Sequence, residues 1–95
     1  MTNSTLTIVQ TPSFKKALKK LHDNQRADLM LAVKQIANEP ELGEKKVGDL
    51  DYLRVYKFKM VNQLTLLAYS YEADQLILEL LMFGSHENFY RDLKR

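Results

Sequence analysis

Three apolar segments in the second half of the chain lie so close together in sequence that they are expected to pair as neighbouring strands. Three residues separate each segment from the next, and the segments are Tyr52 to Met60, Leu64 to Tyr71 and Gln75 to Phe83. Connections this short form hairpins, whereas a parallel crossover needs a dozen residues or more. The sequence therefore predicts an antiparallel meander whose last strand ends where Gly84 begins.

The segment before these strands predicts a first amphipathic helix. Thr11 and Pro12 are suited to the N-cap and to the first helical position. Phe14, Leu18 and Leu21 then recur at intervals of four and three residues, which places them on one helical face. Lysines occupy the opposite face.

A second helix is expected to follow after a short turn, capped by Asp23 or Asn24. It continues to about Asn38 and stops before Pro40. The residues expected to be buried are Leu29, Val33, Ile36 and Ala37. A turn this short makes the two helices an antiparallel hairpin.

The remaining segments complete an α+β fold. Alternation over Thr5 to Gln10 predicts a short half-buried strand with Leu6 and Ile8 facing the core, and Glu41 to Leu50 is expected to be irregular. The predicted order is β-α-α-β-β-β: a two-helix hairpin packed on one face of a four-stranded antiparallel sheet, followed by a short C-terminal helical turn.

Length and composition limit the possible classes of protein. The 95 residues are enough for one domain, assigned here to residues 1–95, and the absence of cysteine excludes disulfides and thiolate metal sites. No stretch approaches the ~20 apolar residues of a membrane span, and the first residues lack the features of a signal peptide. We therefore expect a cytoplasmic protein that does not contact membranes.

The basic residues are grouped, although the formal net charge is only +2. The groups are Lys15, Lys16, Lys19 and Lys20; Lys45 and Lys46; Lys57 and Lys59; and Arg91, Lys94 and Arg95. Separated basic patches fit contact with a polyanion, and ordinary solvated surfaces give the same pattern. Lys45, Lys46, Arg91 and Lys94 are candidate RNA contacts on the first interpretation.

Strand periodicity separates two sets of side chains on the segment that follows Tyr52. Tyr56, Phe58 and Met60 are expected to pack under the helices, and Arg54 shares their side. Lys57 and Lys59 then project from the uncovered face, roughly 7 Å apart along the strand. That spacing suits one or two phosphates, while a charged face that prevents edge aggregation is the alternative.

A glycine, an imidazole and a phenol follow the last strand in close succession. Gly84-Ser85-His86 is followed by Tyr90, one helical turn after the histidine, and by Arg91. His86 is the best acid–base candidate because an imidazole titrates near cellular pH. His22 lies in the turn between the helices and is interpreted as incidental.

This tail resembles the C-terminal signature of the RelE/ParE superfamily of bacterial toxins, in particular its ribosome-dependent mRNA endonucleases. The passage Gly48-Asp49-Leu50 … Leu53-Arg54-Val55 and the order of elements also look like that family. The resemblance implies a type II toxin that is held by a cognate antitoxin and that cleaves mRNA in the ribosomal A site. It also implies that Tyr90 stacks on or orients a nucleotide.

The chemistry that suits these residues is attack of an RNA 2′-hydroxyl on its own phosphate. His86 would act as acid or base, Lys57 and Lys59 would stabilise the charged phosphorane, and Arg91 and Arg54 are further candidate phosphate contacts. Neither a metal nor a cofactor is required, because the substrate carries the nucleophile.

The sequence also departs from the endonuclease pattern. Thr65 stands where several members have an arginine, and Glu44-Lys45-Lys46 replaces a histidine-bearing loop. Two other functions therefore stay open: a ParE-like poison of DNA gyrase, and a non-catalytic relative that retains antitoxin binding. The presence of His86 favours the endonuclease, because gyrase-directed relatives commonly lack that histidine.

Overall fold

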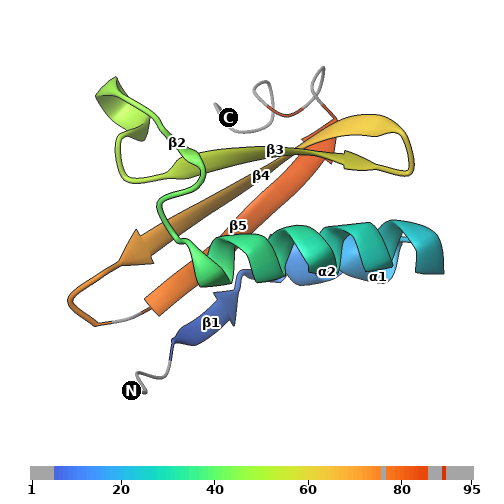
Figure 1. The fold of residues 1–95 in the computed structure, drawn as a ribbon, viewed down its shortest axis with the longest axis horizontal. Helices are drawn as coiled ribbons and strands as arrows, with labels where there is room; N and C mark the ends of the chain where they lie inside the picture. The colour runs from blue at the N-terminus through green and yellow to red at the C-terminus, as the bar shows by residue number, and fades with distance from the viewer. Residues whose placement is uncertain (1–5, 76, 86–88, 90–95) are drawn as a thin grey trace.

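The computed structural model describes residues 6–75, 77–85 and 89, and in it a helical layer covers one face of a single sheet (Figure 1). Neither described helix is long and apolar enough to cross a membrane. In chain order the elements are β1 (Thr7–Gln10), α1 (Pro12–Lys19), α2 (Asp23–Asn38), β2 (Glu44–Lys45), the 3-10 turn η1 (Gly48–Leu50), β3 (Arg54–Met60), β4 (Gln63–Glu72) and β5 (Ile77–Ser85).

Within the described residues the sheet has five strands in the order β1-β5-β4-β3-β2. The antiparallel meander of β3, β4 and β5 is confirmed. The prediction of four strands, all antiparallel, is wrong in two respects: β1 runs parallel to β5, and β2 adds a strand to the segment that was expected to be irregular. Periodicity carries no information about strand direction, and two residues are too few to establish a period.

The two helix starts differ in how well the sequence predicted them. Thr11 caps α1 as expected, its hydroxyl accepting a hydrogen bond from the Phe14 N–H at 3.1 Å. The expectation that Asp23 or Asn24 caps α2 is wrong. His22 is the N-cap residue, and its backbone N–H donates to Oε1 of Gln25 at 2.8 Å. The N-cap lies one residue before Asp23, because the Gln25 side chain in the first turn of the helix accepts the hydrogen bond from the N-cap backbone N–H.

The main core lies between the helices and the sheet. Its fully or nearly buried members are Phe14, Leu29, Ala32, Val33, Ile36, Leu67, Tyr69, Leu78 and Leu80, and the predicted Tyr56, Phe58 and Met60 pack against them. Ala37 is only half-buried. Leu6 packs against this core, whereas Ile8, which pairs with the core residue Leu78, is 43% exposed because β1 is an edge strand.

A second cluster covers part of the opposite face of the sheet. It consists of Leu53, Val55, Leu66, Ala68 and Phe89, with Leu50, Leu81 and Met82 packed against it. The expectation that this face is open is therefore wrong for the end of β3 nearest β2. Residues 65–69 of β4 are buried without interruption, which reflects cover on both faces rather than one.

A β-bulge in β5 explains how one strand serves both cores. Ala68 pairs with Met82 and Tyr69 with Leu80, so Leu81 has no partner in the β4 ladder. Because the extra residue reverses the alternation, both Leu80 and Phe83 pack on the helix side. A side chain from outside the strand holds the bulge in place: the Thr11 hydroxyl donates a hydrogen bond to the Leu81 carbonyl at 2.6 Å.

The loop between α2 and β2 is held by two side chains from the sheet. The Tyr69 hydroxyl donates to the Pro40 carbonyl at 2.6 Å and accepts from the Gly43 N–H at 2.8 Å. Arg54 donates to the carbonyls of Gly43 and Glu41 at 2.9 and 3.2 Å. A Cβ at position 43 would lie 2.7 Å from the Tyr69 oxygen, so only glycine permits this approach.

Replacement of Gly43 by alanine should therefore destabilise the fold. The added methyl group must push Tyr69 out of its buried position, which we expect to cost about 1–3 kcal/mol of unfolding free energy. Gly84→Ala is the matched control, because its Cβ would meet no atom within 4 Å, and its effect should stay within about 0.5 kcal/mol. Urea unfolding of both variants measures the difference, and equal effects would contradict the close contact.

Tyr69 should also make stability depend on pH in the alkaline range. Burial raises the pKa of Tyr69 above its ordinary value, outweighing the lowering effects of the Gly43 N–H and of Arg54. The unfolded chain then loses the phenolic proton near pH 10 while the folded chain keeps it, so this contribution is present below pH 10 and is lost as pH rises further.

The Tyr69→Phe variant tests this dependence. At pH 8 it should be about 1–3 kcal/mol less stable than the parent, because the Gly43 N–H loses its acceptor. The gap should narrow as pH rises above 10. Unfolding by urea at several pH values measures it, with Tyr71→Phe as the control for loss of a half-exposed phenol, and a gap that stays constant to pH 11 would exclude the mechanism.

Candidate functional site

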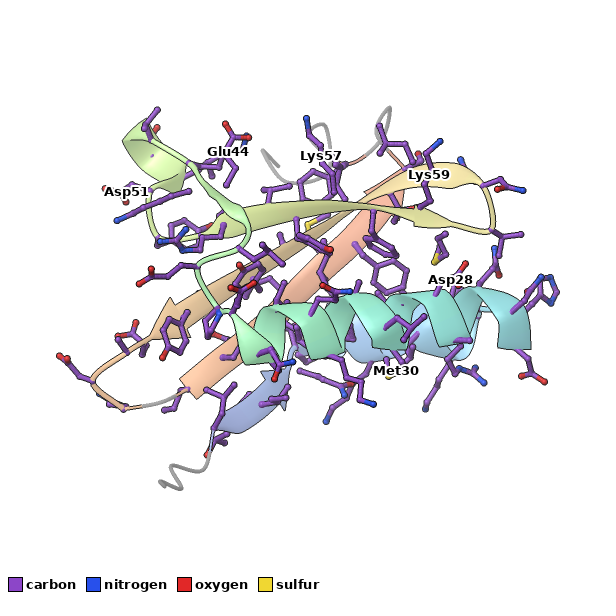
Figure 2. The ribbon with its side chains drawn as sticks, in the orientation of Figure 1. Asp28, Met30, Glu44, Asp51, Lys57 and Lys59 are labelled. Carbon is purple, nitrogen blue, oxygen red and sulfur yellow. The ribbon has the colours of Figure 1, made fainter. Side chains whose placement is uncertain are left out.

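Lys57 and Lys59 project from the face of the sheet that is turned away from the helices, here called the far face (Figure 2). Both side chains are exposed, as strand periodicity predicted. They follow Val55 on the same side of β3, just beyond the point where the second cluster stops covering the sheet. Neither lysine has an ion-pair partner within the part of the chain that the structure describes.

A row across three strands links these lysines to the end of β5. Lys57 pairs with Leu66 on β4, and Leu66 pairs with Gly84 on β5. Strands are about 4.8 Å apart, so the Cα atoms of Lys57 and Gly84 are roughly 10 Å from each other. A Cβ at Gly84 would meet no atom of the described residues within 4 Å, so none of their side chains fills this position of the row.

The last strand lies two residues later than predicted, running from Ile77 to Ser85, and Gln75, its expected first residue, lies in a turn. It was expected to end at Phe83, and it continues through Gly84 to Ser85, which pairs with Thr65. Gly84 does not end the strand, because its backbone still pairs with β4. The absence of a side chain only leaves less packed surface at that point of the far face.

β2 contributes a carboxylate, Glu44, to the same face, and Lys46, the residue after β2, pairs with it. Glu44 pairs with Val55 and points to the far face, where its Oε1 lies 3.6 Å from Nζ of Lys46 (Figure 2). Lys45 pairs with Arg54 and is exposed, with the opposite orientation along the strand. Glu44 was not among the predicted site residues. Its orientation follows from its place in β2, and that strand was not predicted.

Arg54 and Thr65 lie on the helix side of the sheet. The Arg54 guanidinium holds the loop carbonyls of Glu41 and Gly43, which is the direction that periodicity predicted. Thr65 pairs with Phe58, is 2% exposed, and donates its hydroxyl to the Gln63 carbonyl at 3.0 Å. A buried threonine here cannot replace the phosphate contact that an exposed arginine would make.

Four of the predicted site residues, His86, Tyr90, Arg91 and Lys94, lie outside the described residues. The described residues on either side of His86 are Ser85, at the end of β5, and Phe89, which is helical and fully buried. Phe89 is therefore a core residue, as expected, while Tyr90 lies outside the described residues. The predicted C-terminal helical turn otherwise falls on residues that are not described.

The geometry therefore combines two ammonium groups that have no ion-pair partner among the described residues, the glycine Gly84 and a carboxylate, Glu44, on one face of the sheet. Two cations on adjacent outward positions suit a phosphate-bearing ligand. Comparison with known proteins then gives the family. A model of the ParE-like toxins of type II bacterial toxin–antitoxin systems matches residues 8–94. The chain belongs to this family.

The fold of this toxin is shared with solved RelE structures. Toxin from the intact E. coli RelBE toxin–antitoxin complex superposes with a TM-score of 0.68 at 16% identity, covering 85% of this chain and 96% of that one. Isolated E. coli RelE gives 0.67 at 17% identity, covering 96% and 98%. The RelBE2 toxin–antitoxin complex of Mycobacterium tuberculosis gives 0.70 at 17%, covering 85% and 98%. No curated protein matches the chain.

Truncation of Phe89 should destabilise the second cluster, which covers part of the far face. Phe89 is fully buried against the second cluster, so Phe89→Ala is expected to lower the unfolding free energy by about 3–5 kcal/mol. Tyr52→Ala removes an aromatic ring that is 59% exposed and should change stability by no more than about 0.5 kcal/mol. Thermal or urea unfolding of the two variants measures the contrast, and a similar small effect of both would show that Phe89 contributes little.

Proposed function

We propose that this toxin inhibits growth by cleaving mRNA on the ribosome, without a metal ion, at a site formed by the far-face lysines and His86. The observation that carries the proposal is the placement of Lys57 and Lys59 on the same face as Gly84, two residues before His86. His86 is bonded to Ser85, and consecutive Cα atoms are about 3.8 Å apart. We propose that the imidazole reaches a phosphate held by the lysines across this short link.

The proposed reaction is transfer of a phosphodiester to the neighbouring 2′-oxygen. A base removes the 2′-hydroxyl proton, the 2′-oxygen forms a bond to phosphorus, and the bond from phosphorus to the 5′-oxygen breaks. An acid then protonates the departing 5′-oxygen, leaving a 2′,3′-cyclic phosphate. His86 acts as acid or base, and Glu44, which pairs with Val55 on β3, is a described carboxylate on the same face as the lysine row.

The remaining groups are assigned by their charge and shape. Lys57 and Lys59 stabilise the additional negative charge of the phosphorane, as preorganised cations do most effectively. Tyr90 stacks on a base, an interaction that contributes about 1–3 kcal/mol. Further contacts with the RNA backbone are proposed for Lys45, Lys46, Arg91 and Lys94. Arg54 is not among them, because its guanidinium holds the loop carbonyls of Glu41 and Gly43 on the helix side.

We also propose a cognate antitoxin as the protein partner. A hollow of about 140 Å³ lies between α2 and β3, and its lining includes Leu31, Ala32, Phe58 and Lys59. Leu31 is 59% exposed, and its neighbour Met30 is 38% exposed. The lining also includes Asp28, so the hollow carries both charges. Exposed apolar groups beside such a hollow suit an amphipathic segment that folds on binding.

Substitutions at the site test the endonuclease proposal. Purified variants are added to translating ribosomes, and cleavage of the mRNA is followed by mapping the new 5′ ends. Lys57→Gln and Lys59→Gln should each lower the cleavage rate by about 10²–10³, and His86→Ala by about 10²–10⁴. Lys34→Gln, an exposed lysine on α2, is the charge-matched control and should retain full activity.

Incorporation of labelled amino acids and thymidine after induction distinguishes the alternative targets. The endonuclease predicts an immediate arrest of translation that His86→Ala relieves. Arrest of replication first, or toxicity that His86→Ala leaves unchanged, would favour gyrase as the target. Absence of toxicity together with retained antitoxin binding would identify a non-catalytic relative.

A further inference from the structure

The turn between β3 and β4 has a strained backbone. Val61 and Asn62 are its two central residues, and both have a positive φ, 49° and 68°. Asparagine tolerates this left-handed conformation, whereas the branched side chain of valine is crowded against its own backbone there. Two-residue turns with two positive φ angles normally contain Asn-Gly or Asp-Gly. The residues at these two positions therefore do not by themselves favour the turn that they form.

A side chain from α2 holds this turn. Oδ2 of Asp28 accepts a hydrogen bond from the Val61 N–H at 2.8 Å, and Figure 2 shows Asp28 on the side of α2 that faces the β3–β4 hairpin. A carboxylate acceptor makes this hydrogen bond charge-assisted and stronger than one between neutral groups. Burial does not offset the strain in the same way, because Val61 is 43% exposed and its side chain gains little from leaving water.

The turn lies next to Lys59, at the less supported end of β3. Lys59 is two residues before Val61 and pairs with Leu64, which is 39% exposed. β2 pairs only with Arg54 and Val55 at the other end of β3. Among the residues that the structure describes, Lys59 therefore has a neighbouring strand on one side only, and its position depends on β4 and on the turn.

Lys57 is held in a different way. It pairs with Leu66, which is fully buried in the middle of β4, and it is four residues from Val61. Side chains packed on both faces of β4 fix this part of the sheet. A change in the turn should therefore move Lys59 and leave Lys57 in place.

We propose that Asp28 is a positioning residue for Lys59. By holding the β3–β4 turn in its left-handed conformation, Asp28 fixes the end of β3 so that the Lys59 ammonium meets the reacting phosphate. The inference rests on the proposed function, in which Lys59 stabilises the phosphorane, and Asp28 itself touches no substrate. Catalysis is sensitive to such placement, since a shift of about 1 Å in a catalytic group can lower a rate by about 10²-fold.

The test measures single-turnover cleavage of mRNA on ribosomes by purified toxin variants. Asp28→Ala removes the acceptor and should lower the maximal rate by about 10-fold, while the half-saturating ribosome concentration changes by less than about 2-fold, because Lys59 acts in the transition state. Asp28→Asn keeps an oxygen that can accept from Val61 and should retain the parent rate to within about 3-fold. Asp23→Ala is the matched control. It removes another carboxylate of α2, one that pairs with Arg26 at 3.6 Å, and should leave the rate unchanged.

A double-mutant cycle separates the positioning of Lys59 from a general loss of stability. In the Lys59→Gln background, Asp28→Ala should lower the rate no further, because the group that it positions is gone. In the Lys57→Gln background, the same substitution should still lower the rate by about 10-fold. A smaller fraction of folded protein would lower the rate by the same factor in both backgrounds.

A substitution within the turn provides a rescue. Asparagine at position 61 adopts a positive φ readily, so the turn should form without help from α2. Asp28→Ala combined with Val61→Asn should therefore return the cleavage rate to within about 3-fold of the parent. The rescue also decides the question if Asp28→Ala alone folds poorly.

Three results would overturn the proposal and leave the endonuclease in place. They are full activity of Asp28→Ala, an equal loss of rate in both lysine backgrounds, and failure of Val61→Asn to restore the rate. Absence of cleavage by the parent toxin would instead remove the proposed function and, with it, the role of Lys59 that Asp28 serves.

Discussion

Burial of β4 on both faces is the constraint from which the rest of this fold follows. Residues 65–69 lie in the middle of the sheet and are all buried, so each face needs an apolar cover. The helices supply one cover, with Phe14, Leu29 and Ile36 at its centre. The other face has no helix of comparable length among the described residues, and Phe89 with the residues around η1 covers it. Two unequal covers explain why one end of the far face stays free for binding.

The two covers are connected through the bulge at Leu81. Without it, strict alternation would place either Leu80 or Phe83 on the wrong side of β5. Thr11 joins this irregularity to the start of α1, because one hydroxyl caps the helix and satisfies the Leu81 carbonyl. The position of α1 therefore depends on a distortion of the strand that ends beside the candidate site.

The sequence predicted the features that depend on local pattern. Helix faces, the start of α1 at Thr11, the meander and the outward direction of Lys57 and Lys59 follow from periods of 3.6 and 2 and from short turns. Local pattern did not predict three other features: the parallel pairing of β1, the bulge in β5 and the packing of Phe89 on the second cluster. Each of them depends on contacts between residues far apart in sequence. Glu44 was missed for the same reason: its strand exists only through pairing with Val55.

Lysine at positions 57 and 59 reduces the stability that apolar burial could give the sheet, which supports a role for these residues in binding. Lys57 pairs with the fully buried Leu66 and follows the buried Val55 on the same face. An apolar side chain there would extend the second cluster and contribute about 1.5–3 kcal/mol if it became fully buried. A lysine can cover apolar surface only with its methylene stem while its ammonium remains in water. Sequences that depart from the most stable choice at one position commonly do so at functional sites. Gly84, two strands away on the same row, also lacks a side chain that could pack. Lys57 and Gly84 thus both lack a packed apolar side chain in one row across three strands. A ligand that occupies this row explains this better than stability of the sheet does.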